Sequence, residues 1–135
     1  MDGRKVVMLG SNNYLGLTNH PKIKEYNLRS VKACISGAAP LPMDVQIKFG
    51  EITGGRLVEG YGLTEAAPVT HCNPIYGQRK AGSIGLPMPD VDARIFDYEK
   101  LVERPVGEEG ELWVKGPQLM KGYWNRPNET AKTIT

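Results

Sequence analysis

The sequence predicts a mixed α/β fold, with a short strand–turn–helix opening, an α/β half and then a small β-barrel-like half. Three observations favour this architecture. Short apolar runs bounded by glycine, proline and asparagine are typical of strands and turns. A helical apolar period runs through residues 42–52. From Gly82 onward the pattern becomes rich in strands and turns.

The opening residues predict a strand, a turn and a short helix. Residues 5–9 form a short apolar run that is typical of a strand. Gly10-Ser11-Asn12-Asn13 follows, and these residue types supply the backbone conformations and local hydrogen bonds of a tight turn. Asn19 is a candidate cap for a helix over residues 21–26, with Pro21 in its first turn.

Two strands and a helix are expected next. Residues 31–35 predict a buried strand, and residues 56–61 predict a second strand. Between them, the period at residues 42–52 predicts a helix that Pro42 opens and Gly54-Gly55 ends. The spacing i, i+4, i+7 places three apolar side chains on one face of this helix: Val45, Phe49 and Ile52.

The second half predicts two strands and the start of a helix. Residues 92–96 and 111–114 have strand character, and residues 104–110 between them have the composition of a turn. Residues 125–130 resemble a helix start, with Asn125 as its cap.

Composition and charge limit the class of protein. A chain of 135 residues with 40% hydrophobic residues can form one domain with a real core. A net charge of +2, with dispersed lysines and arginines, does not favour nucleic acid or a membrane as partner. No signal peptide or spanning segment is recognisable, so we expect a soluble cytoplasmic protein. Cys34 and Cys72 lack metal-site spacing, and we expect buried or free thiols rather than a disulfide.

The motif with the most chemistry is Glu59-Gly60-Tyr61-Gly62-Leu63-Thr64-Glu65. Tyr61 offers a ring face, Gly62 allows close backbone approach, Thr64 offers a hydroxyl donor, and Glu65 offers a carboxylate. A nucleotide-phosphate site with magnesium needs these groups. The alternative is a strand followed by an ordinary glycine turn, in which Tyr61 is a half-buried strand aromatic and Glu65 a solvated carboxylate.

A second block, Gly37-Ala38-Ala39-Pro40, lies upstream. Residues without bulk let a planar base or an acyl chain lie against the backbone, whose polar groups can read its edge. A strand-to-helix turn built from small residues explains the same block. His71, near the first motif, either lines an acyl tunnel or is a loop histidine without function, and His20 is most simply a surface residue.

In order and spacing, these blocks resemble the adenylate-forming superfamily, and most closely the fatty-acid–CoA ligases. Residues 110–116 and Lys121-Gly122-Tyr123-Trp124 continue the resemblance, which runs from about Asn19 or Lys22 to the last residue. It implies ATP-dependent acyl activation, with ATP or AMP, an acyl group and Mg²⁺ as ligands.

The resemblance also assigns roles. It implies that Gly37, Ala38 and Ala39 line the adenine and acyl pockets. Tyr61, in the segment with Gly62, would stack on adenine. Thr64 would hydrogen-bond the α-phosphate and Glu65 would hold magnesium. For residues 82–87 and 110–116, it implies structural turns and strands.

The sequence lacks three features that adenylation in this superfamily uses. It contains no phosphate loop ending in Pro-Lys-Gly, no Thr-Gly-Asp motif for the ribose and no C-terminal domain with a catalytic lysine. Positioned charge-stabilising groups contribute roughly 10²- to 10³-fold each. We therefore assign no catalytic residue, and expect this polypeptide to be inactive as a ligase with weak or no binding of ATP and Mg²⁺.

Residues 1–21 resemble a different family. Ser11-Asn12-Asn13-Tyr14-Leu15-Gly16-Leu17 is similar to the start of the pyridoxal-phosphate (PLP) α-oxoamine synthases, such as glycine C-acetyltransferase and 8-amino-7-oxononanoate synthase. The rest of that fold has no counterpart, so PLP binding is not expected. We interpret the chain as an engineered chimera, or a misassembled natural product, of residues 1–21 and a partial adenylation domain at 22–135 that fold as one unit.

Two further readings involve no ligand. In the first, the chain is a structural domain selected only for folding. In the second, it forms a homodimer through strand edges that the removal of the remaining ligase exposes. Residues 6–9 could pair beside the strand at 31–35 and cover its edge.

Overall fold

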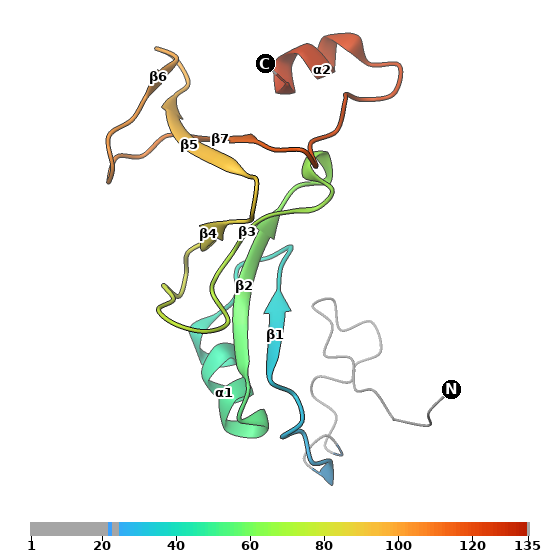
Figure 1. Cartoon of the computed structure of the whole chain (residues 1–135), viewed down its shortest axis with the longest axis vertical. Helices are drawn as coiled ribbons and strands as arrows, with labels where there is room; N and C mark the ends of the chain where they lie inside the picture. The colour runs from blue at the N-terminus through green and yellow to red at the C-terminus, as the bar shows by residue number, and fades with distance from the viewer. Residues whose placement is uncertain (1–21, 23–24, 135) are drawn as a thin grey trace.

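The computed structural model describes residue 22 and residues 25–134, which form two small sheets and flanking helices (Figure 1). The strand and turn predicted at residues 5–13, and half of the helix predicted at residues 21–26, lie outside the described residues. The elements in chain order are β1 (Ala33–Ser36), α1 (Met43–Thr53), β2 (Arg56–Gly62), the 3₁₀ helix η3 (Thr64–Ala66), β3 (Val69–Cys72), β4 (Leu86–Pro87), β5 (Asp92–Asp97), β6 (Val102–Glu103), β7 (Glu111–Lys115) and α2 (Pro127–Thr133).

The first sheet has the order β1-β2-β3-β4. β1 and β2 are parallel, with Cys34 opposite Leu57, whereas β2–β3 and β3–β4 are antiparallel. The two strands predicted at residues 31–35 and 56–61 are thus confirmed. However, β1 is an edge strand and Ile35 is 60% exposed, so the prediction that it is buried is wrong. Among the described residues, no strand pairs with its outer edge.

Helix α1 confirms the predicted helix and its ends. Pro42 precedes it in an extended conformation, and Gly54 ends it in the left-handed region with its N–H donating to the Gly50 carbonyl. The predicted apolar face is wrong, because Val45 and Ile52 are 42% and 46% exposed. The buried face consists of Gln46, Phe49 and Thr53. Helix α1 carries apolar residues on more than one of its sides, so periodicity alone does not determine which side packs against the sheet.

The second sheet has the order β6-β5-β7. β5 and β7 confirm the strands predicted at residues 92–96 and 111–114. In their antiparallel register, the stacked rings of Phe96 and Trp113 lie 4.4 Å apart between centroids. Within the described residues the strands do not close a barrel, so the barrel-like half is not found there. β4, from the Gly82–Pro87 block, belongs to the first sheet.

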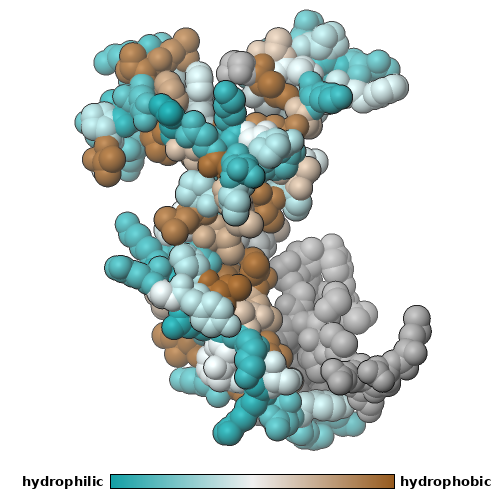
Figure 2. All heavy atoms as spheres, in the orientation of Figure 1, coloured by the Kyte–Doolittle hydropathy of each residue, from teal (hydrophilic) through white to brown (hydrophobic). Residues whose placement is uncertain are grey.

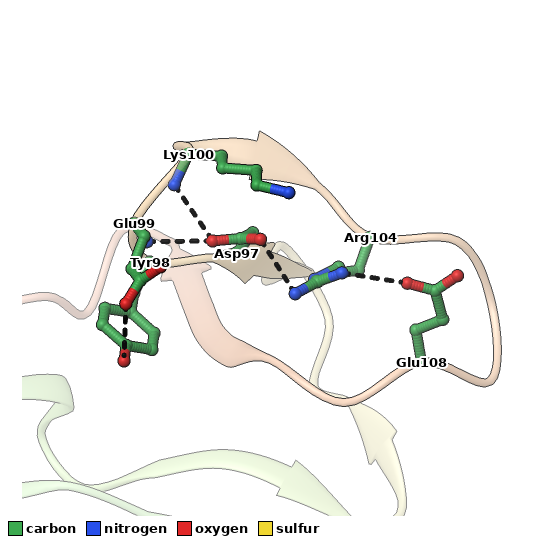
Figure 3. Close-up of polar contacts among 6 residues, drawn as sticks. All are labelled: Asp97, Tyr98, Glu99, Lys100, Arg104 and Glu108. Carbon is green, nitrogen blue, oxygen red and sulfur yellow. Dashed lines mark hydrogen bonds and ion pairs between the residues drawn. The ribbon is translucent and has the colours of Figure 1, made fainter.

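A buried carboxylate organises the turn between β5 and β6 (Figure 3). Asp97 accepts hydrogen bonds from the backbone N–H groups of Glu99 and Lys100 and pairs with Arg104 at 2.8 Å. Arg104 also reaches Glu108 at 3.1 Å. The backbone N–H of Lys100 is the largest of the causes that lower the pKa of Asp97. The Asp97 side chain therefore fixes both the turn and the start of the following loop.

The short helix α2 begins later than predicted. Asn125 is not its cap, because it has a left-handed backbone with φ of 53° and Arg126 occupies the cap position. Pro127 then opens the first turn, where its missing N–H costs nothing. In the part of the chain that the structure describes, no helix has the length and apolarity needed to cross a bilayer.

The hydrophobic core is small. Among the described residues, the buried hydrophobic side chains are Leu28, Phe49, Val58 and Ala66. Many large apolar side chains are instead exposed, and apolar atoms reach the surface in both the lower and the upper part of the molecule (Figure 2). The sizeable core that composition suggested is therefore not formed by the described residues. Cys34 and Cys72 are free thiols, as expected.

Candidate functional site

The two glycine-containing blocks lie side by side at one edge of the first sheet. β1 and β2 run parallel, so their carboxyl ends meet there, with Ser36 opposite Glu59. A Cβ added to Gly37 would lie only 3.1 Å from the Gly60 carbonyl oxygen. Ligands of open α/β sheets bind outside the carboxyl ends of parallel strands. The structure therefore brings the two predicted blocks together at a place where such ligands bind.

The first block forms a tight turn. Gly37 is half-buried, while Ala38 and Ala39 are exposed. Ala38 has a φ of 69°, a left-handed conformation that is uncommon for a residue with a side chain. The geometry suits both predicted readings, namely a backbone surface for a flat ligand and a compact strand-to-helix turn.

Tyr61 and Gly62 lie where β2 turns back into β3. The register shifts between these two residues, and a Cβ on Gly62 would lie 1.7 Å from the Pro68 carbonyl oxygen. Only glycine fits there. The half-buried ring of Tyr61 meets that of His71 edge-on, with centroids 6.2 Å apart. The ring of Tyr61 therefore packs against a side chain of the paired strand β3.

His71 is not a loop residue, so that part of its prediction is wrong. It belongs to β3 and is 4% exposed, and its Nδ1 lies 2.9 Å from the Thr70 hydroxyl oxygen. Burial lowers the pKa of the imidazole, because the charged form is poorly solvated there. Its place in an acyl tunnel remains a prediction, and His20 lies outside the described residues.

Thr64 and Glu65 belong to the 3₁₀ helix η3, which lies in the connection between β2 and β3. Thr64 is exposed and Glu65 is half-buried. The Tyr123 hydroxyl donates a hydrogen bond to Glu65 Oε1 at 2.5 Å, and the Met120 N–H donates to the Glu65 carbonyl at 2.8 Å. The phenol hydrogen bond is the main cause that lowers the pKa of Glu65, and it raises the pKa of Tyr123. Glu65 is therefore a held carboxylate, not a freely solvated one.

The sequence motifs predicted no role for Tyr123. The signal available was its place in the Lys121–Trp124 block, but nothing local relates that block to Glu65, which lies 58 residues earlier. Their contact exists only because the segment after β7 returns to the end of the first sheet, as the trace in Figure 1 shows.

Glu65 suits magnesium only in combination with a ligand that brings its own oxygen atoms. The described residues contain no group of three histidine, cysteine, aspartate or glutamate side chains that could hold a metal. Magnesium in nucleotide sites is usually bound by one or two carboxylates together with phosphate oxygens and water. One carboxylate next to an exposed threonine hydroxyl matches that donor set.

A hollow of about 470 Å³ lies beside this region rather than between the two glycine blocks. It is lined by Lys121, Gly122, Tyr123, Trp124, Asn125, Pro127, Thr130 and Ala131. Tyr123 therefore both lines this hollow and contacts Glu65. Around Gly37 and Tyr61 the described residues offer a surface for a ligand, and we assign no enclosed pocket to it.

The sequence of this chain is similar to one family of enzymes. The family described as AMP-binding enzyme matches residues 6–124. A long-chain-fatty-acid–CoA ligase of Bacillus subtilis (strain 168) is 54% identical over 121 residues, which cover 90% of this chain and 22% of that protein. The chain thus spans about a fifth of the length of the curated relatives it matches.

The fold is also similar to solved structures. Apo MatB from Rhodopseudomonas palustris matches with a TM-score of 0.78 and 36% identity, over 91% of this chain and 24% of that one. The ATP-bound structure of MatB from the same organism gives a TM-score of 0.72 and 34% identity, over 90% and 24%. The family match begins at residue 6, inside the segment that resembles the α-oxoamine synthases.

Proposed function

The chain belongs to the AMP-binding enzyme family, and from that premise we propose that it forms part of the nucleotide-facing surface of a fatty-acid–CoA ligase. The observation that carries the proposal is that three separate segments are linked through the carboxyl end of β2: Gly37 packs against Gly60, and the Met120 N–H and the Tyr123 hydroxyl both donate to Glu65, which follows β2. These segments are the turn at 37–39, the stretch at 61–65 and the loop at 120–123.

Each group has a role that its position supports. The backbone at Gly37–Ala39 and the ring of Tyr61 would contact the adenine, and Gly62 lets the chain turn tightly beside them. The exposed Thr64 hydroxyl would donate to a phosphate oxygen. Glu65 would take part in holding a magnesium ion, which when bound neutralises phosphate charge. The same proposal includes an acyl group as the second ligand, by analogy with the ligase relatives.

For the 135-residue polypeptide alone, we propose weak nucleotide binding without turnover. The phosphate loop, ribose aspartate and catalytic lysine named above do not occur in its sequence. These groups supply charge stabilisation that the surface at 37–65 does not replace. Formation of acyl-CoA from ATP, CoA and a fatty acid by the purified polypeptide would refute this part.

The origin of residues 1–21 is a separate hypothesis. The Ser11–Leu17 string supports descent from an α-oxoamine synthase, whereas a family match starting at residue 6 favours a continuous AMP-binding sequence. If the segment is a graft that protects the β1 edge, a variant lacking residues 1–20 melts at a much lower temperature or aggregates. Unchanged thermal melting would argue against it.

A second candidate function is dimerisation. Among the described residues, β1 is an edge strand, and its Ile35 side chain is 60% exposed. Edges of this kind pair with a second chain unless something covers them. This candidate requires no nucleotide and is tested by mass measurement.

The decisive experiment for nucleotide binding is a titration of the ¹⁵N-labelled protein with ATP and Mg²⁺, followed by amide NMR. We expect shifts at Gly37–Ala39 and at Tyr61–Glu65, because these backbone groups would face the ligand. Tyr61→Ala should weaken binding about 5- to 150-fold, since stacking on a base is worth about 1–3 kcal/mol.

A matched control is Tyr98→Ala, because Tyr98 is 68% exposed and lies in the turn after β5, away from the proposed site. It should leave the affinity unchanged. A dispersed spectrum that does not respond to ATP at millimolar concentration would refute the proposed binding and leave the chain as inherited structure.

A further inference from the structure

Glu65 is held by one short segment through both its backbone and its side chain. The Met120 N–H donates to the Glu65 carbonyl at 2.8 Å, and the Tyr123 hydroxyl donates to Oε1 at 2.5 Å. Two contacts from residues 120–123 thus fix the main chain of η3 and one oxygen of its carboxylate. A glutamate side chain loses rotamer freedom when it is held in this way, so the cost of ordering it is met before any ligand arrives.

Tyr123 is in turn anchored by helix α2. The Tyr123 backbone N–H donates to Thr130 Oγ1 at 2.9 Å. The Thr130 hydroxyl in turn donates to the Arg126 carbonyl at 3.0 Å. Gly122 has a φ of 149°, and a Cβ there would lie 2.8 Å from Thr130 Cγ2. The phenol therefore projects from a backbone whose position the helix determines, and its hydroxyl cannot drift far from Glu65.

The chemistry of the donor also matters. A lysine or arginine beside Glu65 would hold the carboxylate but would neutralise its charge. A phenol hydroxyl orients the carboxylate through a charge-assisted hydrogen bond and leaves the negative charge available. Because Oε1 takes the phenol hydrogen bond, Oε2 is the oxygen that the phenol leaves open to a cation.

We propose that Tyr123 is a positioning residue, which orients the Glu65 carboxylate toward a divalent cation carried by a bound triphosphate. The proposal rests on the proposed nucleotide function. It assigns to the Lys121–Trp124 block a role in metal-dependent nucleotide binding that acts through Glu65 and needs no contact between Tyr123 and the ligand.

The test compares Tyr123→Phe with the wild-type 135-residue protein, measuring the ATP dissociation constant with Mg²⁺ and again in EDTA. Loss of one hydrogen bond to a charged group should reduce the enhancement by Mg²⁺ about tenfold or more. Metal-free affinity should stay unchanged, because Tyr123 does not touch the nucleotide. In a Glu65→Gln background, the same substitution should have no further effect.

The chain supplies a matched control in a second tyrosine–glutamate pair. The Tyr98 hydroxyl donates to Glu99 Oε1 at 3.3 Å on the exposed turn after β5, so Tyr98→Phe should preserve the Mg²⁺ enhancement. Replacement of Mg²⁺ by Mn²⁺ adds a local readout: line broadening at the Glu65 amide in wild type should weaken in Tyr123→Phe.

The outcomes separate this inference from the proposed function. A wild-type protein that binds no ATP under either condition overturns both. A Tyr123→Phe variant that keeps the full Mg²⁺ enhancement overturns only the role of Tyr123. Equal loss of affinity with and without Mg²⁺ also overturns it, because that pattern reports a general structural defect.

Discussion

Single buried polar side chains hold the loops of this protein in place. Asn73 is 4% exposed, and its amide donates to the Ser83 carbonyl at 2.7 Å while its oxygen accepts from the Lys80 N–H. Asp97 does the same for the turn after β5 (Figure 3). Each side chain forms hydrogen bonds with loop backbone groups that are not paired with a neighbouring strand. Each therefore contributes more to the stability of the fold than the exposed side chains near it.

Asp97→Asn should destabilise the protein in a pH-dependent way. Hydrogen bonds and Arg104 hold the pKa of Asp97 below its usual value. The resulting stabilisation is complete above the unfolded pKa of about 3.9 and is lost as the pH falls through the lower folded value. The melting temperature of Asp97→Asn should therefore be clearly lower than that of wild type at pH 7. The difference between the two melting temperatures should narrow below about pH 4.

Glu108→Gln is the control for this prediction. Glu108 pairs with the same arginine, but its side chain is 50% exposed. Exposed ion pairs contribute about 0–1 kcal/mol, so this variant should melt close to wild type at every pH. Parallel pH profiles for Asp97→Asn and wild type would contradict the role of the buried carboxylate.

At the scale of elements, the docking of β4 onto β3 depends on one glycine. Gly85 has a φ of 89°, and a Cβ there would lie 2.2 Å from the Asn73 nitrogen and from the Cys72 carbonyl carbon. Gly85→Ala must therefore move backbone as well as occupy a left-handed conformation. We expect the substitution to separate β4 from β3. The free energy of unfolding should therefore fall by much more than the left-handed conformation alone would cost.

Gly77→Ala provides the comparison, because Gly77 has almost the same φ, 90°, with nothing within 4 Å of the added Cβ. It should cost only the left-handed conformation, roughly 1–2 kcal/mol. Urea unfolding of both variants measures the difference. Equal free energies of unfolding would show that the close approach of Gly85 to β3 does not matter.

At the scale of the whole molecule, exposed apolar surface is the dominant feature. Ile35 on β1 and Ile47 on α1 are both more than half exposed, although each belongs to a regular element. In the relatives, about four fifths of the chain lies outside the matched region. The edge of β1 and the outer face of α1 are therefore two separate apolar surfaces, which single substitutions can test one at a time.

Lysine substitution distinguishes the two surfaces. If strand edges mediate a homodimer, Ile35→Lys should shift the mass measured by light scattering after size exclusion toward the monomer. Ile47→Lys should leave the mass unchanged, because it alters the helix face. Both should keep the thermal stability of dilute protein within about 0.5 kcal/mol, since the side chains are exposed. A wild-type mass that stays monomeric at high concentration would refute the dimer.

Local sequence patterns determined much of the secondary structure. The helix at 43–53 and the strands β2, β5 and β7 lie within a residue or two of their predicted positions. Their signals are caps, turn residues and apolar period, which act over a few residues. The family resemblance of residues 22–135 likewise followed from motif order, and the match over residues 6–124 supports it.

Only the tertiary structure decided which surfaces are covered and which distant groups meet. It placed β1 at an edge, turned Gln46 rather than Val45 inward and paired Glu65 with Tyr123 across 58 residues. The roles of the site residues and the division at residues 21 and 22 remain predictions. The physical reason for the difference is that periodicity reports what a segment can bury, whereas burial depends on what another segment brings against it.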